Sequence, residues 1–296
     1  MKYNNKFNLP RSIAQAIEND TYDLKDIDPG RISISQLINP AKIRALTARH
    51  WKDIEEDISD SIWRLLGQAV HSVLERAEHH QSIIEERLTE SLAGFRVTGK
   101  ADLYESEEKT IQDYKVTSAW SLVYKKESDK LWEQQLNTYA WLWRKAGFPV
   151  EQLKIIAILR DWSKTKAKQD NSYPQLPIAI ISLPLWDEAM QEQFIRARIE
   201  LHAAAEQLPD DEICVCTPSE RWSDADVYAV YKNTNKTATK LCDTQMEAEQ
   251  FIASCSGDKH KYSIQRRPGV DRRCMEYCNV CQWCNFWKSK YGKEGE

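Results

Sequence analysis

The chain has 296 residues, of which 42% are hydrophobic and 29% charged, and its 41 Lys and Arg against 45 Asp and Glu leave a net charge of −4. This composition indicates one large or two modest globular domains and excludes collagen-like and low-complexity chains. The acidic balance excludes a global basic field, although a local basic groove is enough to bind phosphates.

The hydrophobic pattern predicts neither a membrane span nor a signal peptide. The longest apolar runs, at 153–159 and 177–185, are far shorter than the roughly 20 residues that cross a bilayer. Residues 1–10 contain no apolar run of the signal-peptide type. We therefore expect a cytoplasmic protein that does not contact membranes.

The cysteines divide the chain into two regions, because all eight lie between Cys214 and Cys284. Cysteines clustered in one segment of a cytosolic chain more often bind metal than form disulfides. We predict an α/β core with an N-terminal helical segment over residues 1–209. Residues 210–296 are expected to form a Cys-rich appendage with ββαβ elements and a metal or cluster site.

In the first region, a helix is expected to begin at Pro40 and a second one at Ile62. From Ile62 the apolar residues recur at the i, i+3, i+4 spacing for more than three turns, while Gly67, His71 and Glu75 follow another stripe. Period-two alternation predicts one strand over 97–104 and a second over 110–116. Further along, we expect a Trp-rich helix over 131–146, buried strands over 153–159 and 178–183, and a long helix over 185–208.

In the second region, residues 227–231 and 237–241 flank a turn and predict a hairpin. Thr244 and Glu247 form a capping box that begins a helix ending near Ala253. A short strand is expected over 262–265.

The candidate chemistry centres on Asp102, Asp113 and Lys115, which lie on the two predicted neighbouring strands. Two carboxylates there would make a hard-oxygen site suited to Mg²⁺ or Mn²⁺. Lys115 shares the strand face of Asp113 and could stabilise charge on an attacked phosphate. His71 could add a nitrogen ligand, and the backbone carbonyl of Tyr114 could complete the coordination.

Each of these residues alone has an ordinary explanation, since Asp-x-Lys is common on solvated strand edges and a lone histidine is more often a surface residue. Their order changes this interpretation: Gly67-x₃-His71, Gly99-x₂-Asp102, Asp113-x-Lys115 and Gln135-x₃-Tyr139. This series resembles the RecB-like branch of the PD-(D/E)XK nuclease superfamily. The resemblance covers roughly residues 33–160, and residues 33–40 are similar to the entry segment of the branch.

The resemblance implies a restriction-endonuclease-like core, a central mixed sheet flanked by helices. It implies that His71, Asp102 and Asp113 are metal ligands and that Lys115 is the catalytic lysine. Gln135 and Tyr139 would orient the site and the DNA end. The branch often carries an acidic residue before the Gly-x-x-Asp strand, for which the candidates here are Glu86 and its rivals Glu85 and Glu90.

As a whole the chain most resembles the phage and prophage exonucleases typified by the RecE nuclease domain. This implies an Mg²⁺- or Mn²⁺-dependent deoxyribonuclease that degrades linear DNA during phage-type recombination or DNA repair, in a bacterial host cytoplasm. It also implies a single-strand annealing recombination protein as a companion. Whether the chain forms a homo-oligomer stays open.

The tail places Cys274, Cys278, Cys281 and Cys284 within 11 residues, with Cys216 upstream. Thiols at this density favour either a tetrahedral Zn²⁺ site or a [4Fe–4S] cluster. Cys242 and Cys255 are expected to be free thiols.

Some members of the branch, including the AddB type and the CRISPR-adaptation exonucleases, hold a [4Fe–4S] cluster with one cysteine before the nuclease core and three after it. Asn39 occupies the position of that first cysteine here. The fourth ligand is therefore Cys216 or its rival Cys281. The resemblance favours a [4Fe–4S] cluster on Cys216, Cys274, Cys278 and Cys284, with Zn²⁺ as the alternative.

Two other functions compete with a nuclease. A non-catalytic DNA-binding module would use the cysteine tail and nearby basic residues, namely Arg266, Arg267, Arg272, Arg273, Lys288 and Lys290. A small-molecule hydrolase would be expected to carry a nucleophile motif such as Gly-x-Ser-x-Gly, which the sequence lacks. The presence of both aspartates, the lysine and the histidine favours the nuclease.

Overall fold

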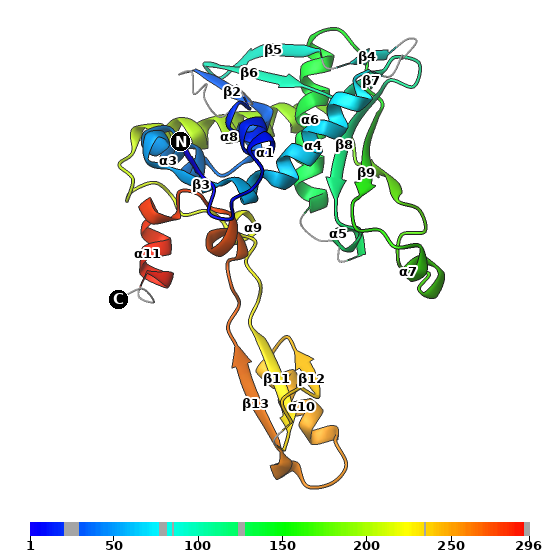
Figure 1. The fold of residues 1–296 in the computed structure, drawn as a ribbon, viewed down its shortest axis with the longest axis vertical. Coiled ribbons are helices and arrows are strands. Elements are labelled where there is room, and N and C mark those ends of the chain that lie inside the picture. The colour runs from blue at the N-terminus through cyan, green and yellow to red at the C-terminus, as the bar shows by residue number, and fades with distance from the viewer. Residues whose placement is uncertain (21–29, 77–81, 85, 124–127, 234, 293–296) are drawn as a thin grey trace. The chain divides into compact units, whose positions relative to one another are not determined.

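The largest sheet has five strands in the order β10-β9-β8-β7-β4 (Figure 1). β8 and β9 are parallel, whereas the other neighbouring strands are antiparallel, so the sheet is mixed. Its strands are β4 (Ser82–Ile84), β7 (Leu103–Glu105), β8 (Thr110–Thr117), β9 (Gln152–Leu159) and β10 (Ile178–Leu183). Four residues of the predicted buried run in β9 are less than 5% exposed, as expected of a strand in the interior of a sheet.

The structure is a computed structural model that describes residues 1–20, 30–76, 82–84, 86–123, 128–233 and 235–292. It divides the chain into an N-terminal unit, Met1–Cys214, and a C-terminal unit, Val215–Glu296. The boundary lies a few residues beyond the predicted one at 209/210, because side chains of the N-terminal unit hold the segment before it. Arg49 forms an ion pair with Asp210 at 2.6 Å, and Nζ of Lys42 donates to the carbonyl of Ile213 at 2.8 Å.

Helices surround two smaller sheets and the large sheet in the N-terminal unit, which is therefore a mixed α/β structure. The helices are α1 (Arg11–Glu18), α2 (Ile34–Ile38), α3 (Ala41–His50), α4 (Ile62–Leu74), α5 (Ala119–Val123), α6 (Ser128–Lys145), α7 (Lys164–Gln169) and α8 (Glu188–Gln207). The small sheets are β2 (Arg31–Ser33) with β6 (Phe95–Lys100) and β5 (Arg87–Leu92), and β1 (Lys2–Asn4) with β3 (Glu55–Asp57). No helix in the described residues is long and apolar enough to span a membrane.

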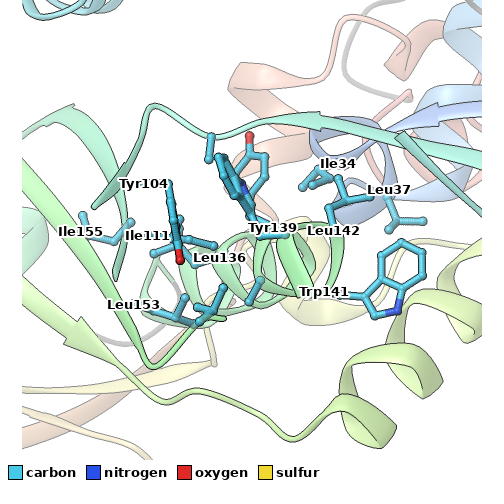
Figure 2. Packing of buried hydrophobic residues seen from close by; sticks show 14 of the residues in the cluster. Ile34, Leu37, Tyr104, Ile111, Leu136, Tyr139, Trp141, Leu142, Leu153 and Ile155 are labelled. Carbon is cyan, nitrogen blue, oxygen red and sulfur yellow. The ribbon is translucent and has the colours of Figure 1, made fainter. Parts of the chain in front are cut away.

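The main core lies between α2, α6 and the strands, and it is rich in large side chains (Figure 2). Trp141 and Trp143 of α6 are each 1% exposed. Tyr104 of β7 stacks on Trp143 with ring centroids 4.5 Å apart. Burying a large apolar side chain stabilises a fold by about 1.5–3 kcal/mol. These aromatic side chains therefore anchor α6 firmly, and α6 carries two of the candidate site residues.

The segment predicted as one strand over 97–104 is two strands in two different sheets. β6 ends at Lys100 and pairs with β5 and β2, whereas β7 begins at Leu103 and pairs with β8 and β4. The strand is interrupted at Asp102, whose carboxylate Oδ2 accepts a hydrogen bond from the backbone N–H of Tyr114 at 2.6 Å. The backbone N–H of Tyr114 lies beyond the last residue pair of the β7–β8 ladder, so it donates to this side chain and not to a strand carbonyl.

The other predicted elements of the N-terminal unit are present with small changes at their ends. The helices expected at Pro40 and Ile62 are α3 and α4, and the strands expected over 153–159 and 178–183 are β9 and β10. α8 begins at Glu188, later than predicted, because the side chain of Asp187 caps it by accepting from the N–H of Met190.

In the C-terminal unit, three antiparallel strands form a sheet in the order β12-β11-β13 (Figure 1). The elements are α9 (Pro218–Arg221), β11 (Val227–Lys232), β12 (Lys240–Cys242), α10 (Gln245–Ser254), β13 (Tyr262–Arg267) and α11 (Asn285–Tyr291). One face of the sheet packs on α10 around Val230, Cys242 and Ala248. β12 is shorter than the predicted strand over 237–241, because Asn233 takes a left-handed φ of 55° and widens the connection.

Both ends of the segment 225–269, which contains this sheet and α10, meet at a narrow neck. Ser223 and Asp271 form an isolated antiparallel bridge, and the N–H of Asp224 donates to the carbonyl of Val270 at 2.9 Å. A Cβ on Gly269 would lie 2.0 Å from the carbonyl oxygen of Asp224, so the two chain ends touch backbone to backbone. Glycine is therefore required at this position.

Candidate functional site

A cavity of about 590 Å³ opens among α2, α4, β6, β8 and α6 of the N-terminal unit. It brings together six of the side chains predicted for the site: His71, Asp102, Asp113, Lys115, Gln135 and Tyr139. They come from α4, α6, β8 and the break between β6 and β7. The fold therefore brings together residues that lie far apart in the sequence.

The α4 wall of the cavity carries Gly67 and His71 one helical turn apart. Apart from the backbone of α4 itself, no atom of the described residues lies within 4 Å of where a Cβ of Gly67 would stand, so this glycine leaves open space in front of the helix. Nδ1 of His71 lies 3.2 Å from Oδ1 of Asp102. The hydrogen bond to Asp102 raises the pKa of His71, while burial acts in the opposite direction.

Asp102 is fixed from two sides. One carboxylate oxygen contacts His71, and the other accepts the backbone N–H of Tyr114. The ring of Tyr114 also packs edge-on against the His71 ring, with centroids 6.2 Å apart. Because these contacts hold the carboxylate at the strand break, it faces the cavity beside β8.

Asp113 is only 2% exposed, and it is the most deeply buried carboxylate of the cavity. Burial raises its pKa to about 6, although the ion pair with Lys115 opposes that rise. Nζ of Lys115 lies 2.5 Å from Oδ2, and Nε2 of Gln135 donates to Oδ1 at 3.3 Å. Within the described residues, Oδ2 accepts no hydrogen bond of good geometry, so the lysine charge is its compensation.

The floor of the cavity depends on the packing of Gly99 against α2 and α6. A Cβ on Gly99 would lie 2.4 Å from Cδ1 of Ile34 and 2.9 Å from Cε1 of Tyr139. Tyr139 is 7% exposed and belongs to the core as well as to the cavity wall (Figure 2). Any larger residue at position 99 would therefore displace Tyr139.

The donors fit a hard divalent cation by type, since two carboxylates and an imidazole line one cavity. Tyr114, whose backbone carbonyl is the other predicted donor, is not one of the described residues that line it. The oxygen of Asp113 that accepts no hydrogen bond also fits this purpose. As they stand, no three His, Cys, Asp or Glu side chains of the described residues surround a common point closely enough for a metal. Lys115 and His71 are instead the cationic partners of the two carboxylates.

The cavity wall includes charged residues that the sequence analysis did not identify. Cations from three elements line it, namely Arg64, Arg87 and Lys100, together with the acids Asp20 and Glu75. Glu75 forms an ion pair with Lys100 at 3.6 Å, and Arg64 forms one with Asp20 at 3.5 Å. The stripe of α4 that contains His71 already included Glu75, whereas no periodic pattern pointed to Asp20.

The acid predicted before the Gly-x-x-Asp strand is placed outside this cavity. Glu86 is exposed and does not line it, and neither does its rival Glu90. Glu85 lies outside the described residues. The residue that β5 contributes to the cavity wall is its first one, Arg87. A carboxylate of the wall comes instead from Glu75 at the end of α4.

A second candidate site lies in the C-terminal unit, where all the cysteines are free thiols. Burial, with smaller contributions from the charges of Glu220, Cys278 and Cys284, raises the pKa of Cys216 to about 12. Burial likewise raises the pKa of Cys278 to about 11, with smaller contributions from its neighbouring cysteines. Cys216 therefore lies near the tail cysteines, although 62 residues separate it from Cys278.

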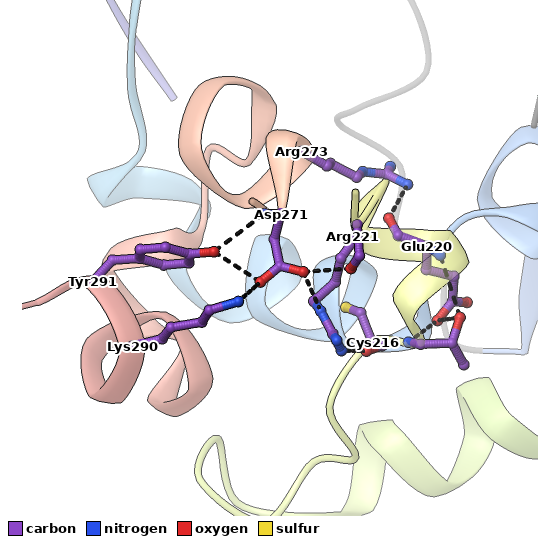
Figure 3. A network of polar contacts seen from close by, with 9 residues as sticks. Cys216, Glu220, Arg221, Asp271, Arg273, Lys290 and Tyr291 are labelled. Atoms are coloured by element: carbon purple, nitrogen blue, oxygen red, sulfur yellow. Dashed lines mark hydrogen bonds and ion pairs between the residues drawn. The ribbon is translucent and has the colours of Figure 1, made fainter. Parts of the chain in front are cut away.

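Asp271 holds the two chain segments of this cysteine cluster together (Figure 3). It is 1% exposed and accepts hydrogen bonds from Arg221, Ser223, Lys290 and Tyr291. Arg221 of α9 also donates to the carbonyl of Cys216, while Lys290 and Tyr291 belong to α11 after the last cysteine. The sequence analysis missed this residue because its partners are scattered and follow no period.

Arg273 adds a half-buried cation to the cluster. Burial lowers its pKa, while the neighbouring thiols of Cys216, Cys278 and Cys274 act to raise it. Its guanidinium lies over the ring of Trp222, with Cζ 5.2 Å from the centroid. A cation in this position stabilises thiolates, the form in which cysteines bind metals.

Comparison with known proteins gives limited matches. No protein-family model and no curated protein sequence matches the chain. Among solved structures, the crystal structure of SSO0001 has a TM-score of 0.42 and 15% identity, and the match covers 64% of this chain and 82% of that one. A phage-related exonuclease from Haemophilus somnus 129PT has a TM-score of 0.29 and 18% identity, with 56% and 70% of the two chains covered.

Proposed function

We propose that the protein is a divalent-metal-dependent deoxyribonuclease that hydrolyses phosphodiester bonds at the ends of linear DNA. The observation that carries this proposal is the meeting of His71, Asp102, Asp113 and Lys115 in one cavity. They come from α4, from the strand break at Asp102 and from β8, so the fold brings together residues from separate parts of the sequence.

Asp102, Asp113, His71 and the backbone carbonyl of Tyr114 are the groups that would hold Mg²⁺ or Mn²⁺. When bound, such an ion supplies a water of lowered pKa and neutralises charge on the attacked phosphate. Gln135 keeps Asp113 in place through its hydrogen bond. The backbone N–H of Tyr114 does the same for Asp102.

Lys115 is the catalytic lysine in this proposal. Its ammonium lies 2.5 Å from Asp113 and is 26% exposed on the cavity side. It can therefore hold a water or stabilise negative charge that develops on phosphate. Arg87 provides further positive charge on the wall, where the flanking phosphates of a DNA strand would lie. Arg64 and Lys100 also line the wall, and they would have to exchange their partners Asp20 and Glu75 for phosphate.

Action at a DNA end and a role in phage-type recombination or repair in a bacterial cytoplasm are drawn from the sequence resemblance. In that setting Gln135 and Tyr139 would orient the DNA end, and a single-strand annealing protein would be the partner. Tyr139 supports this role by its place in the cavity wall.

For the cysteine cluster we propose a [4Fe–4S] cluster on Cys216, Cys274, Cys278 and Cys284, with Zn²⁺ as the alternative. The charges of Cys278 and Cys284 act on the pKa of Cys216, and the charge of Cys281 acts on the pKa of Cys278, so both rivals lie near the other tail cysteines. The choice of Cys216 as the fourth ligand is drawn from the sequence resemblance. Anaerobically purified protein should contain about four irons or about one zinc per chain. Cys216→Ser should remove that metal if the assignment holds, whereas Cys281→Ser should retain it.

The nuclease proposal is tested by incubating end-labelled linear DNA and closed circular DNA with the protein, with and without Mg²⁺ or Mn²⁺. We expect metal-dependent release of mononucleotides from the linear DNA and none from the circle. Cleavage of the circle would indicate an endonuclease. Binding without any cleavage would favour the non-catalytic DNA-binding alternative.

The structure makes the basic set predicted for that alternative less suitable for DNA. Arg266 is paired with Asp226, Arg272 with Asp224, and Lys290 with Asp271. Arg273 is committed to the cysteine cluster. Most of these cations are therefore already compensated within the C-terminal unit.

A further inference from the structure

One face of the three-stranded sheet in the C-terminal unit carries no helix. α10 covers the face that presents Tyr228, Val230, Tyr262 and Ile264. Because side chains alternate along a strand, the register places on the opposite face the side chains of Val227, Ala229, Tyr231, Leu241, Ser263, Gln265 and Arg267. We call this second surface the open face.

The open face carries polar side chains beside one exposed apolar residue, Leu241, and it is hollowed at one end. Tyr231, Ser263 and Gln265 from the strands line a shallow hollow with Asn233, Asn235 and Lys236 from the β11–β12 connection. Arg267 extends this surface along β13, where its guanidinium lies over the Tyr231 ring and donates to the Tyr231 hydroxyl. Arginine, lysine, serine, asparagine, glutamine and tyrosine are the side chains that proteins use to contact phosphate and sugar in DNA.

The charge of this segment differs from that of the whole chain. Residues 227–267 contain seven Lys and Arg and four Asp and Glu, although the chain as a whole is acidic. The four acids are on the α10 side or in loops: Asp243 precedes α10, Glu247 and Glu249 lie on it, and Asp258 caps the turn before β13. The register therefore places no carboxylate on the open face within the described residues.

The two cations of the open face differ from their neighbours on the other face. Arg266 pairs with Asp226, and Lys240 lies over the ring of Phe251. Within the described residues, by contrast, neither Lys236 nor Arg267 has an ion pair with a carboxylate. Their charge is available to an external anion.

We propose that the open face binds the phosphate backbone of DNA as a second contact, separate from the cavity. The match in charge and in side-chain type selects a polyanion that is contacted without base reading. The proposal depends on the proposed function only in the choice of DNA. A chain that holds DNA at this face keeps a long polymer bound while its end is in the cavity.

The test measures binding of the full-length protein to a fluorescein-labelled DNA duplex in EDTA, over about 50–200 mM salt. Each lost phosphate contact lowers the slope of log K against log salt by about 0.9. The double variant Lys236→Gln with Arg267→Gln should therefore lose about 1.8 from the slope. Its affinity near 0.1 M salt should fall about tenfold per cation removed.

The matched control is the double variant Lys240→Gln with Arg266→Gln, which removes the same charge from β12 and β13 on the α10 side. It should change the slope by less than half as much. Two results would overturn the proposal. Equal slopes for the two double variants would mean that DNA is attracted unspecifically by charge. A wild-type slope for Lys236→Gln with Arg267→Gln would mean that the open face has a different occupant, such as a protein.

A second pair of variants protects the test against misfolding. Gln265→Glu places one negative charge on the open face without changing the side-chain shape, and Gln250→Glu does the same on exposed α10. Only the former should weaken DNA binding, and weakening by both would count against the proposal.

The outcome is separable from that of the nuclease proposal. Hydrolysis of a nitrophenyl ester of thymidine monophosphate needs the cavity alone, and all three open-face substitutions should leave it unchanged. If the protein hydrolyses neither DNA nor the ester but the slope changes as expected, DNA binding at the open face is supported and the nuclease proposal is wrong. If the protein hydrolyses the ester and the slopes do not change, the nuclease proposal is supported and DNA binding at the open face is wrong.

Discussion

Asp113 in the N-terminal unit and Asp271 in the C-terminal unit are both buried carboxylates, 2% and 1% exposed, yet their surroundings differ. Burial acts to raise the pKa of both. At Asp271, hydrogen bonds from Lys290, Ser223, Arg221 and Tyr291 outweigh that effect and hold the pKa well below its usual range. At Asp113, one lysine and one distant amide leave the pKa raised to about 6.

The difference separates a structural carboxylate from one available for chemistry. Asp271 uses its acceptor capacity on four protein side chains, so it ties α9 to α11 and has little left for a ligand. Asp113 retains an oxygen without a hydrogen bond, in a cavity lined by cations. An under-compensated buried charge is destabilising, and a bound divalent cation would correct it.

Exchanging Asp113 for Asn should give the largest effect on activity. We expect Asp113→Asn to lower DNA cleavage more than about a thousandfold, because the amide keeps the shape and loses the charge that holds a divalent ion. DNA binding should persist or become tighter, since repulsion of phosphate falls. Single-turnover cleavage with Mg²⁺ and Mn²⁺ measures the rate, and a wild-type rate would show that the site is misplaced.

The same exchange at Asp271 should have the opposite consequence. Asp271→Asn presents an amide to two cations and should destabilise the C-terminal unit by about 3–5 kcal/mol, the scale for breaking a buried ion pair. Ester hydrolysis in the cavity should remain. Denaturant unfolding followed by tryptophan fluorescence measures the loss, and an unchanged midpoint would contradict the assigned role of Asp271.

The two carboxylates should also give opposite pH dependences in metal-free protein. Asp113 has a folded pKa of about 6 against 3.8 for an ordinary aspartate, so the unfolded chain ionises first and stability falls as pH rises from about 4 to 6. That loss amounts to about 3 kcal/mol once ionisation is complete.

Asp271 contributes stability that is present above about pH 4 and lost as pH falls. His71, with its raised pKa, adds stability that is lost as pH rises through its folded pKa. Thermal unfolding in EDTA between about pH 2 and 8 tests the signs. In Asp113→Asn the decline between about pH 4 and 6 should disappear, and its persistence would refute the assignment.

Replacing the lysine sharpens the comparison, because Lys115 is the main compensation of Asp113. Lys115→Ala should lower turnover about a hundredfold or more, the scale for losing a charge that stabilises the transition state. The Mn²⁺ affinity of the protein should hold or increase, since Asp113 loses its ammonium competitor. Lys154→Ala is the control, because this lysine is on neighbouring β9 and pairs with Glu108 outside the cavity.

Local patterns were sufficient to predict most elements, including α4 with His71 and β8 with Asp113 and Lys115. They failed at Asp102, where apolar alternation continues although the strand breaks, because the hydrogen bond to Tyr114 joins residues that periodicity does not connect. Asp20 and Arg87 could not be assigned to the cavity for the same reason. Likewise, the four partners of Asp271 come from two segments about 50 residues or more apart along the chain.

The neck at Ser223 and Asp271 makes the segment carrying the open face a side branch of the chain. The chain enters and leaves segment 225–269 at two backbone stretches that are hydrogen-bonded to each other. We therefore expect that this segment can be lengthened, exchanged or removed without changing how Cys216 meets the tail cysteines. In evolution, an insertion of this kind can diversify while the cluster it interrupts stays fixed. A relative that lacks the segment would have Cys216 close to Cys274 in sequence, and its cysteines would read as one short continuous motif.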